Sequence, residues 1–216
     1  MKEKVLFIGA NDMREISLYQ DVYKEGLFIE PIPEVFKELE KNLNEVNKLN
    51  GNNFQALQAL VTNKESETYD FHLYSTDNLY ASSSIFKMHK NEQDRLGYKE
   101  TIKLQSKRMS NIISLFNLDI KNYDVVIDVQ GAELEVLKSF DDHINKIDWL
   151  KTEISTTDIY YEGGVLFNEL NSFLNKHKLF TKGVAQGHMD LIYEKSWQIL
   201  IHNLILKHDR ANDRRN

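Results

Sequence analysis

Short apolar segments that alternate with helix-like segments constrain the fold of this chain more than any other feature. The apolar segments are Val5 to Ile8, Leu27 to Ile29, the VVIDV stretch within residues 123 to 140, and Trp149 to Ile154. Short apolar strands separated by helices are typical of a mainly parallel sheet that is covered on both faces. Two closing segments, Leu179 to Val184 and Asp190 to Tyr193, flank Gln186-Gly187 and predict an antiparallel edge. We therefore expect an α/β fold.

The segments between these strands carry helix signals. Pro33 suits a first helical turn, and the apolar residues after it recur in steps of three and four: Val35, Phe36, Leu39, Leu43 and Val46. Further helices are expected over residues 12 to 24, 112 to 118 and 165 to 174, and after Gly131 with Leu134, Leu137 and Phe140 on one face. Further strands are expected over residues 54 to 62, 69 to 75 and 101 to 105, and residues 76 to 98 should form a long polar loop.

Composition excludes several classes of function. The 216 residues are 41% hydrophobic and carry a formal net charge of -6, so neither a nucleic acid nor an anionic membrane is expected as a partner. The chain has no cysteine, which excludes disulfides, thiolate nucleophiles and Cys-ligated zinc. No apolar run reaches the roughly 18 residues of a membrane helix, and the run before Gly9 is too short for a signal peptide. We expect a soluble cytoplasmic protein.

Residues 1 to 196 are expected to form a single domain. Residues 197 to 216 are interpreted as a C-terminal helix followed by a frayed basic tail. The apolar stripe of that helix either packs on the sheet or makes a homo-oligomer contact; it consists of Trp197, Leu200, Ile201 and Leu204.

Polar residues follow the apolar strands at the points where the strands end. In open parallel sheets, ligands bind outside the carboxyl ends of the strands, where the strand order reverses. The residues at these ends are Gly9-Ala10-Asn11, Glu30-Pro31, Asp128 with Gln130 and Gly131, Glu153 with Ser155, and Gln186, His188 and Asp190. The fold would bring several of these groups together, so the sequence predicts a ligand site there.

Glu30 indicates the class of ligand. It lies roughly 20 residues after the Gly9 turn, at the end of a strand, where a carboxylate can accept hydrogen bonds from both hydroxyls of a ribose. A dinucleotide fingerprint needs three glycines, and here Met13 occupies the position of another small residue. A nucleoside ligand without a pyrophosphate therefore fits better, and S-adenosylmethionine is the common one.

Each of these residues also has a simpler structural interpretation. Glu30 is compatible with a solvated turn, and Asp128 with a cap on the helix that follows. Glu133 and Glu135 are interpreted as first-turn partners of the helix dipole on a solvated face. His188 is interpreted by default as a surface or turn residue, and Tyr160-Tyr161 as packing residues.

Taken together, these motifs resemble the FkbM-type family of S-adenosylmethionine-dependent methyltransferases. LFIGANDM shares Gly-Ala-Asn with the first family motif, although Phe7 replaces its acid and Met13 its second glycine. LFIEPIPEVFKELEKN matches the Glu-Pro-x-Pro helix closely, and SSSIF resembles the serine-rich loop. DVQGAELEVL keeps Asp128 and Gly131-Ala132-Glu133, but Gln130 replaces a glutamate. TEISTTDIYYEG and QGHMDLIYEK resemble the later motifs, so the resemblance spans roughly residues 5 to 195.

The resemblance implies a Rossmann-like class I methyltransferase fold, with a seven-stranded, mainly parallel sheet, an antiparallel edge strand and helices on both faces. It implies S-adenosylmethionine as cofactor, with S-adenosylhomocysteine as product. The residues implied to bind the cofactor are Gly9, Ala10, Asn11, Glu30, Pro31, Leu60, Val61, Asp128 and Gln130. Family members commonly methylate hydroxyl groups of sugars or polyketide-type products.

Methyl transfer to a hydroxyl benefits from a base within hydrogen-bond reach. Asp128 and His188 are the candidate catalytic residues. Residues predicted to contact a small-molecule or saccharide acceptor are Ser83, Ser84, Glu153 and Tyr161. A divalent metal on Asp128, Glu153 or Asp190 is an alternative way of activating the acceptor. The sequence has no dedicated metal motif, so no metal is expected.

Three hypotheses follow for the function. The first is an O-methyltransferase that acts on a glycan or a small natural product. The second is a degenerate cofactor-binding or interaction protein of the same fold, suggested by Phe7, Met13 and Gln130. The third is a nicotinamide-dependent oxidoreductase, against which the missing glycines count.

Overall fold

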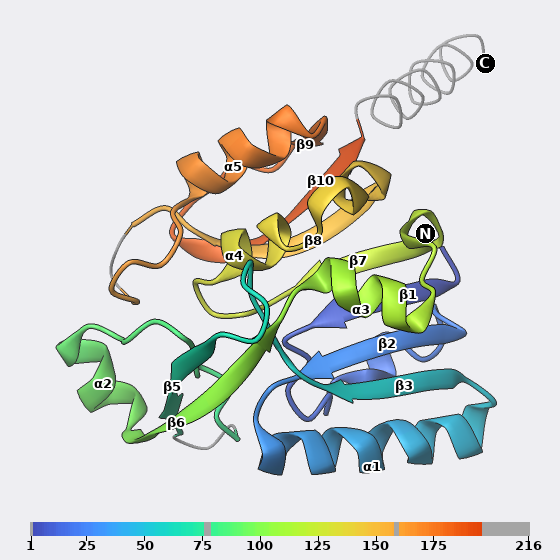
Figure 1. Cartoon of the computed structure of the whole chain (residues 1–216), viewed down its shortest axis with the longest axis horizontal. Coiled ribbons are helices and arrows are strands. Elements are labelled where there is room, and N and C mark those ends of the chain that lie inside the picture. Colours follow the sequence, from blue (N-terminus) through green and yellow to red (C-terminus); the bar gives the residue numbers. More distant parts are fainter. Residues whose placement is uncertain (1, 76–78, 158–159, 196–216) are drawn as a thin grey trace, which may run out of the picture.

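The computed structural model describes residues 2–75, 79–157 and 160–195 (Figure 1). Within these residues, seven strands form one sheet in the order β3-β2-β1-β7-β8-β10-β9. Their bounds are β1 Lys4–Ile8, β2 Glu25–Glu30, β3 Asn53–Gln58, β7 Tyr123–Ile127, β8 Trp149–Ser155, β9 Leu179–Thr181 and β10 His188–Lys195. Neighbouring strands are parallel from β3 through β8, and β10 is antiparallel to both β8 and β9. The predicted α/β fold is confirmed, with the antiparallel strand one position in from the edge.

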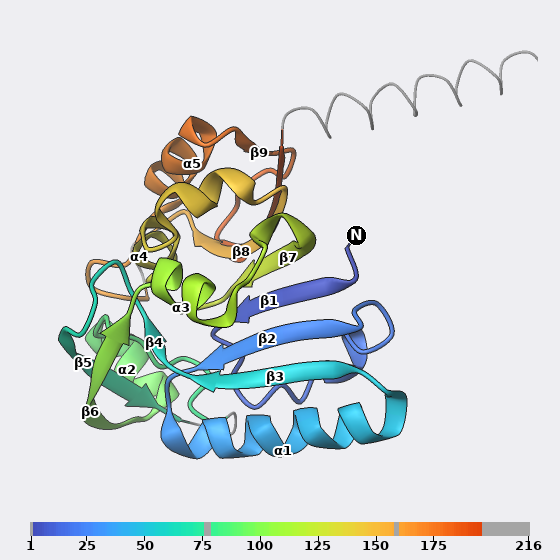
Figure 2. The same cartoon turned by 45° about the vertical axis from the view of Figure 1, so that its right-hand side comes forward.

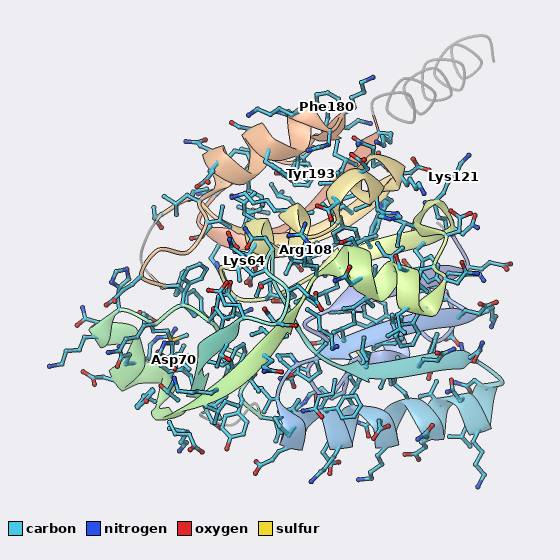
Figure 3. The ribbon with its side chains drawn as sticks, viewed as in Figure 1. Lys64, Asp70, Arg108, Lys121, Phe180 and Tyr193 are labelled. Carbon is cyan, nitrogen blue, oxygen red and sulfur yellow. The ribbon has the colours of Figure 1, made fainter. Side chains whose placement is uncertain are left out.

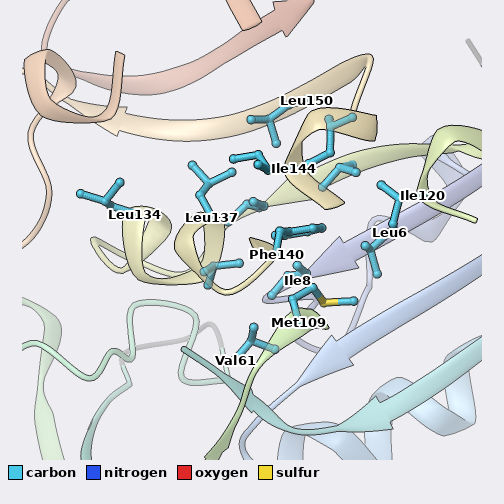
Figure 4. Close-up of a cluster of buried hydrophobic side chains, with 14 of the residues drawn as sticks. Leu6, Ile8, Val61, Met109, Ile120, Leu134, Leu137, Phe140, Ile144 and Leu150 are labelled. Atoms are coloured by element: carbon cyan, nitrogen blue, oxygen red, sulfur yellow. The ribbon is translucent and has the colours of Figure 1, made fainter. Parts of the chain in front are cut away.

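Helices cover both faces of this sheet (Figure 2). One face packs on α1, Pro33–Asn50, and on the short η1 turn, Ile16–Leu18. The other face packs on α3 Met109–Phe116, α4 Glu133–Lys138 and α5 Phe167–Lys176, together with the short turns η2 Ile120–Asn122 and η3 Asp141–Lys146. Figure 4 shows the larger core on this second face, where Leu6 and Ile8 of β1 meet Met109, Leu137 and Phe140.

The stripe predicted after Pro33 forms the buried side of α1. Val35, Leu39, Leu43 and Val46 are all buried. Proline at the first helical position costs no hydrogen bond, because that N–H has no partner in a helix. Gly51 ends the helix with a φ of 71°, a conformation that glycine adopts without strain. The predicted helices around residues 112 to 118 and 165 to 174 are likewise found as α3 and α5.

The single strand predicted over residues 54 to 62 is wrong. β3 ends at Gln58, and β4, Leu60–Val61, leaves the main sheet to pair with β6, Tyr98–Lys107. β6 also pairs with β5, Thr68–Tyr74, so β4, β6 and β5 make a second, three-stranded sheet. The split is invisible in a continuous apolar run, because it depends on which distant strand supplies the hydrogen bonds.

Arg108, labelled in Figure 3, connects the second sheet to the main layer. Its guanidinium donates to the carbonyl oxygen of Asn63 and pairs with Asp141 of η3. Its backbone N–H donates to Glu65 at 2.6 Å. The loop after β4 is therefore held against the helical layer of the main sheet.

The helix predicted over residues 12 to 24 is also wrong. This segment forms turns around η1, and Asn11 and Met13 both have a φ of 50°. The Asn11 side chain accepts a hydrogen bond from the N–H of Asp12, and the Asp12 side chain accepts one from the N–H of Arg14. Short polar side chains that capture backbone N–H groups in this way compete with the helix.

The predicted loop over residues 76 to 98 contains a helix, α2, Lys90–Leu96. Glu92 and Arg95 form an ion pair along it at 2.6 Å. None of its residues is buried, so it has no apolar stripe from which a sequence pattern could indicate it. Residues 76–78 lie outside the described part of the chain.

The predicted C-terminal helix and basic tail, residues 197 to 216, lie outside the described residues, and the single-domain assignment of residues 1 to 196 stays a prediction. Among the described residues, no helix is long and apolar enough to cross a membrane.

Candidate functional site

The strand order reverses between β1 and β7, and a cavity of about 310 Å³ opens at the carboxyl ends of these strands. This is the position at which open α/β sheets bind ligands. We call it the first cavity. Of the residues predicted to bind a cofactor, the structure places all nine on its lining: Gly9, Ala10, Asn11, Glu30, Pro31, Leu60, Val61, Asp128 and Gln130.

The turn after β1 lies directly against the end of β7. The N–H groups of Gly9 and Ala10 both donate to the carbonyl oxygen of Ile29, at 2.9 and 3.0 Å. Gly9 has a φ of 85°, and a Cβ atom there would lie 1.8 Å from the carbonyl oxygen of Asp128. Glycine is therefore required for the close packing of the two strand ends that form the cavity floor.

Glu30 is buried at the end of β2, and it organises the turn after β1. One carboxylate oxygen accepts from the N–H of Asn11 at 3.0 Å, and the other from the N–H of Ile32 at 2.8 Å. Burial raises the pKa of Glu30 to about 7, although these two hydrogen bonds oppose the rise. The solvated-turn interpretation of Glu30 is wrong, since its exposed fraction is 4%.

Asp12 and Arg14 are cavity residues that the sequence analysis missed. The Nη2 atom of Arg14 lies 2.8 Å from Oδ2 of Asp12, and the Nε atom lies 3.1 Å from the same oxygen. Both residues line the first cavity, where Arg14 is the one cation of the described lining. They lie just beyond Gly-Ala-Asn, in the segment predicted to be a helix, so no motif indicated that they would line the site.

Phe7 and Met13, the two departures from the family motif, are both buried beside the first cavity. The Phe7 ring meets Tyr19 edge-on, with ring centroids 5.6 Å apart, and stacks on Phe28. Both side chains belong to the apolar cluster under α1. The motif positions are thus filled by core residues, and the cavity above them stays open.

The far end of the first cavity is apolar. Leu60 and Val61 of β4 line it together with Ile32 and Phe71. Leu60, Val61 and Phe71 belong to the second sheet, and Ile32 precedes α1, so the departure of β4 from the main sheet shapes this end. A flat apolar group such as a base fits such a lining, because aromatic and aliphatic side chains supply its contacts.

Gln130 connects two carboxylates at the end of β7. Its Nε2 atom donates to Oδ1 of Asp128 at 2.6 Å and to Oε2 of Glu153 at 3.0 Å. Its Oε1 atom lies 2.9 Å from the hydroxyl of Tyr161. Partial burial and the neighbouring Glu153 raise the pKa of Asp128 to about 7, and the Gln130 amide opposes this shift.

Glu153 continues this chain of contacts to His188. The Oε1 atom of Glu153 lies 2.8 Å from Nε2 of His188, and the carboxylate raises the histidine pKa. The His188 ring also packs on Tyr160, with ring centroids 4.6 Å apart. The two predicted catalytic residues, Asp128 and His188, are therefore linked through Gln130 and Glu153.

A second cavity of about 320 Å³ adjoins the first. His188, Glu153, Lys151 and Asp190 line it from β8 and β10. Asp128, Phe7 and Glu15 line both cavities, so Asp128 lies at their junction.

The predicted acceptor residues Ser83 and Ser84 are both buried, and their hydroxyls bond to backbone groups. The Ser83 hydroxyl accepts from the N–H of Tyr74 at 3.1 Å. The Ser84 hydroxyl donates to the carbonyl oxygen of Gln130 at 2.7 Å. Tyr161 is also buried, and its hydroxyl donates to the carbonyl oxygen of Ser82 at 2.9 Å. These contacts hold the serine loop against the turn between β7 and α4.

Glu133 is a buried carboxyl, so its assignment to a solvated face is wrong. Its Oε1 atom accepts from the N–H of Gly131 at 3.1 Å and from the N–H of Val129 at 3.3 Å. Burial, reinforced by Glu153, raises its pKa to about 8. Glu135, expected on a solvated face, is half-buried, and its Oε1 atom lies 3.9 Å from Nζ of Lys138.

In residues 2–75, 79–157 and 160–195, no group of three or more His, Cys, Asp or Glu side chains is placed to hold a metal ion. Asp190, one of the three residues considered for such a role, pairs with Lys151 at 2.7 Å.

The sequence matches the family described as the methyltransferase FkbM domain over residues 8–180. The chain is similar to methyltransferase FkbM from Methylobacillus flagellatus KT, with a TM-score of 0.52 and 13% identity over 89% of this chain and 43% of that one. It is also similar to an uncharacterised protein from Listeria monocytogenes serotype 4b, with a TM-score of 0.50 and 9% identity over 90% and 62% of the two chains.

A further similar structure is TrmK from M. capricolum in complex with S-adenosyl-homocysteine, with a TM-score of 0.48 and 15% identity over 89% and 62% of the two chains. The chain spans less than two thirds of the length of each of these three proteins. No curated protein matches it. The seven-stranded Rossmann-like fold expected from the motifs is confirmed.

Proposed function

The chain belongs to the FkbM methyltransferase family. We propose that it transfers a methyl group from S-adenosylmethionine to a hydroxyl of a sugar, a glycan or a small natural product. One observation carries the proposal. Asp128 lies at the junction of two cavities, one lined by all the predicted cofactor residues and the other by the Glu153–His188 pair.

The charges of the first cavity suit this cofactor. Its lining has four carboxyl residues, Asp12, Glu15, Glu30 and Asp128, and the cation Arg14. S-adenosylmethionine carries a sulfonium, an ammonium and a carboxylate, so a lining with an excess of negative charge complements it. Arg14, held by Asp12, is the group that would receive the carboxylate.

The neutral parts of the cofactor also find partners in this cavity. Glu30 would accept the ribose hydroxyls, as its position at the end of β2 favours. Pro31, Leu60 and Val61 would flank the adenine, and the Gly9–Asn11 turn would lie along the methionine and ribose side. When bound, the cofactor supplies an electrophilic methyl group on its sulfonium sulfur.

The chain's own residues then act on the acceptor hydroxyl. Glu153 accepts a hydrogen bond from Nε2 of His188, which leaves Nδ1 as the nitrogen able to take the hydroxyl proton. Gln130 holds Glu153 and Asp128 in place by donating one hydrogen bond to each. Positioning contributes much of the rate in such a reaction, because the methyl donor is already reactive.

The acceptor side carries the remaining predictions. Ser83 lines the first cavity and Glu153 the second, whereas Ser84 and Tyr161 line neither and make hydrogen bonds to backbone carbonyl oxygens. The saccharide character of the acceptor, a cytoplasmic location and a homo-oligomer contact through residues 197 to 206 stay predictions from the sequence.

Calorimetric titration with S-adenosylhomocysteine tests the proposal. We expect binding to the wild-type protein, weaker binding to Glu30→Ala, and unchanged binding to the control Glu40→Ala, whose side chain is exposed on α1. No binding at millimolar ligand would contradict the proposal and favour the degenerate protein. A thermal-shift experiment compares S-adenosylhomocysteine with nicotinamide adenine dinucleotide. The methyltransferase proposal predicts stabilisation by the first compound, and the oxidoreductase hypothesis predicts stabilisation by the second.

A further inference from the structure

The second cavity lies on the face of the main sheet that carries α1. Phe7 and Val126, which line it, belong to the apolar cluster under that helix. On β8 and β10, Glu153 pairs directly with Asp190, and residues opposite each other in an antiparallel pair point to the same side. The second cavity therefore lies on the sheet surface beside the first cavity. Asp128 lines both cavities, whereas the β4 residues Leu60 and Val61 line only the first.

Among residues 2–75, 79–157 and 160–195, none covers this part of the sheet face completely. Ile192 lies two residues after Asp190 on β10 and pairs with Lys151 of β8. Its exposed fraction is 49%. Tyr19, beside η1, lines the opposite wall of the cavity. A molecule can therefore approach from above the sheet and meet His188 without passing through the first cavity.

The polar lining carries an excess of negative charge. Four carboxyl residues face it, namely Glu15, Asp128, Glu153 and Asp190, and the histidine His188 is paired with one of them. Lys151 is the lysine of this lining, and its ammonium is bound to Asp190 at 2.7 Å. The cavity therefore has no unpaired cation among its described lining residues to offer to an anionic ligand.

We propose that this second cavity is the acceptor site, and that it selects an uncharged or amino-bearing polyhydroxyl compound of about monosaccharide size over an acidic one. The inference deepens the proposed function and rests on it. The volume of about 320 Å³ is at the lower end of the range of small-molecule pockets, roughly 300–1,000 Å³.

The selection follows from electrostatics and from desolvation. A uronate or sugar phosphate would bring its charge beside Glu153 and Asp190, where like charges repel and an oxyanion would lose hydration without gaining a cation. A hydroxyl or an ammonium would instead donate to these same carboxylates. One charge contact at about 4 Å in water-like surroundings is worth about 1 kcal/mol, or about fivefold in affinity.

A scaffold-matched ligand series tests the inference. Methyl glucoside, its 2-amino analogue and methyl glucuronide are titrated by ligand-observed NMR against protein saturated with S-adenosylhomocysteine. We expect the neutral and amino compounds to bind at least about fivefold more tightly than the glucuronide. Asp190→Asn releases Lys151 from its ion pair, and should therefore tighten glucuronide binding by about fivefold.

The matched control is Glu194→Lys, on the same strand and the same sheet face but off the cavity lining, and it should leave the preference unchanged. S-adenosylhomocysteine affinity, measured for each protein, reports on the fold and on the first cavity. If it binds but the glucuronide binds as tightly as the neutral compound, or if none of the three compounds binds, the acceptor-site inference is overturned and the proposed function stands. If S-adenosylhomocysteine itself does not bind, the proposed function fails as well.

Discussion

The Nε2 atom of His188 lies 2.8 Å from the Oε1 atom of Glu153, across the antiparallel pairing of β10 and β8. A carboxylate that accepts from one imidazole nitrogen orients the ring and directs proton uptake to the other nitrogen. The same carboxylate is bound through Gln130 to Asp128. His188, a candidate base, is therefore connected through Glu153 and Gln130 to Asp128 at the junction of the two cavities.

The first prediction concerns this pair. His188→Ala should lower kcat about 10²–10⁴-fold, as expected for loss of a general base. Glu153→Gln should lower kcat less, and should move the ascending limb of the pH–rate profile to lower pH, because Glu153 raises the pKa of His188. Initial rates of S-adenosylhomocysteine release across pH measure both effects. His177→Ala, on the half-buried residue after α5, is the control, and an equal loss there would exclude a specific role.

The second prediction restores the glutamate of the family motif. Gln130→Glu replaces an amide that donates to two carboxylates with a third carboxylate. Like charges at this distance disfavour ionisation, so the variant should be less stable by about 2 kcal/mol at pH 8, with a smaller deficit at pH 5.5. Thermal unfolding at both pH values measures this. Gln55→Glu, at an exposed position of β3, should show little change; a Gln130→Glu protein as stable as wild type at pH 8 would refute the charge argument.

The third prediction concerns the pH dependence of cofactor binding. Glu30 must be ionised to accept two ribose hydroxyls, and its pKa in the free protein is about 7. The Kd of S-adenosylhomocysteine should therefore rise about tenfold between pH 8 and pH 6. Calorimetry with Glu30→Gln, which removes this ionisation, should give weaker binding with a flatter profile. A profile unchanged by the substitution would assign the pH dependence to Asp128 instead.

The fourth prediction concerns the buried carboxyl of Glu133. Its pKa is about 8 when folded and 4.5 in the unfolded reference, so its contribution to stability is complete below pH 4.5 and is lost as pH rises toward 8. Glu133→Gln should remove this loss and raise the free energy of unfolding at pH 8 by at least about 1 kcal/mol, or about 2–4 °C in Tm. The half-exposed Glu135→Gln is the control, and a lower Tm for Glu133→Gln at pH 8 would contradict the assignment.

The fifth prediction separates backbone strain from steric clash at Gly9. Gly9 and Gly187 both have a positive φ, 85° and 66°, but only at Gly9 would a Cβ meet another atom within 4 Å. Gly9→Ala should therefore cost at least about 2 kcal/mol more than Gly187→Ala. Denaturant unfolding measures the difference. Equal costs would show that the close packing on Asp128 is not needed.

Local sequence patterns predicted the elements that depend on near neighbours. The stripe from Val35 to Val46 indicated α1, because its apolar residues recur on one side of the helix and are buried there. The strand ends at Gly9, Glu30 and Asp128 were predicted to converge, because the carboxyl ends of parallel strands meet at one edge. Both inferences need only the periodicity of a segment and the rule for parallel sheets.

Patterns failed where the structure depends on particular hydrogen bonds, distant or local, that leave no periodic trace in the sequence. A continuous apolar run hid the break at Ala59, since β4 takes its hydrogen bonds from β6. The segment that holds the Asp12–Arg14 pair was interpreted as a helix, because periodicity does not reveal that the Asp12 side chain accepts from the backbone N–H of Arg14. The sequence predicted a solvated Glu133, but its carboxylate is buried and accepts from backbone N–H groups of the preceding turn.

The sequence by itself determined an α/β sheet with polar strand ends and a carboxylate placed for a nucleoside. Only the tertiary structure decided that Gln130, Glu153 and His188 form one connected chain of contacts and that a second cavity adjoins the first. These residues come from the turn after β7 and from β8 and β10, and their meeting depends on strand register. A shift of one residue in that register would turn each side chain to the opposite face of the sheet.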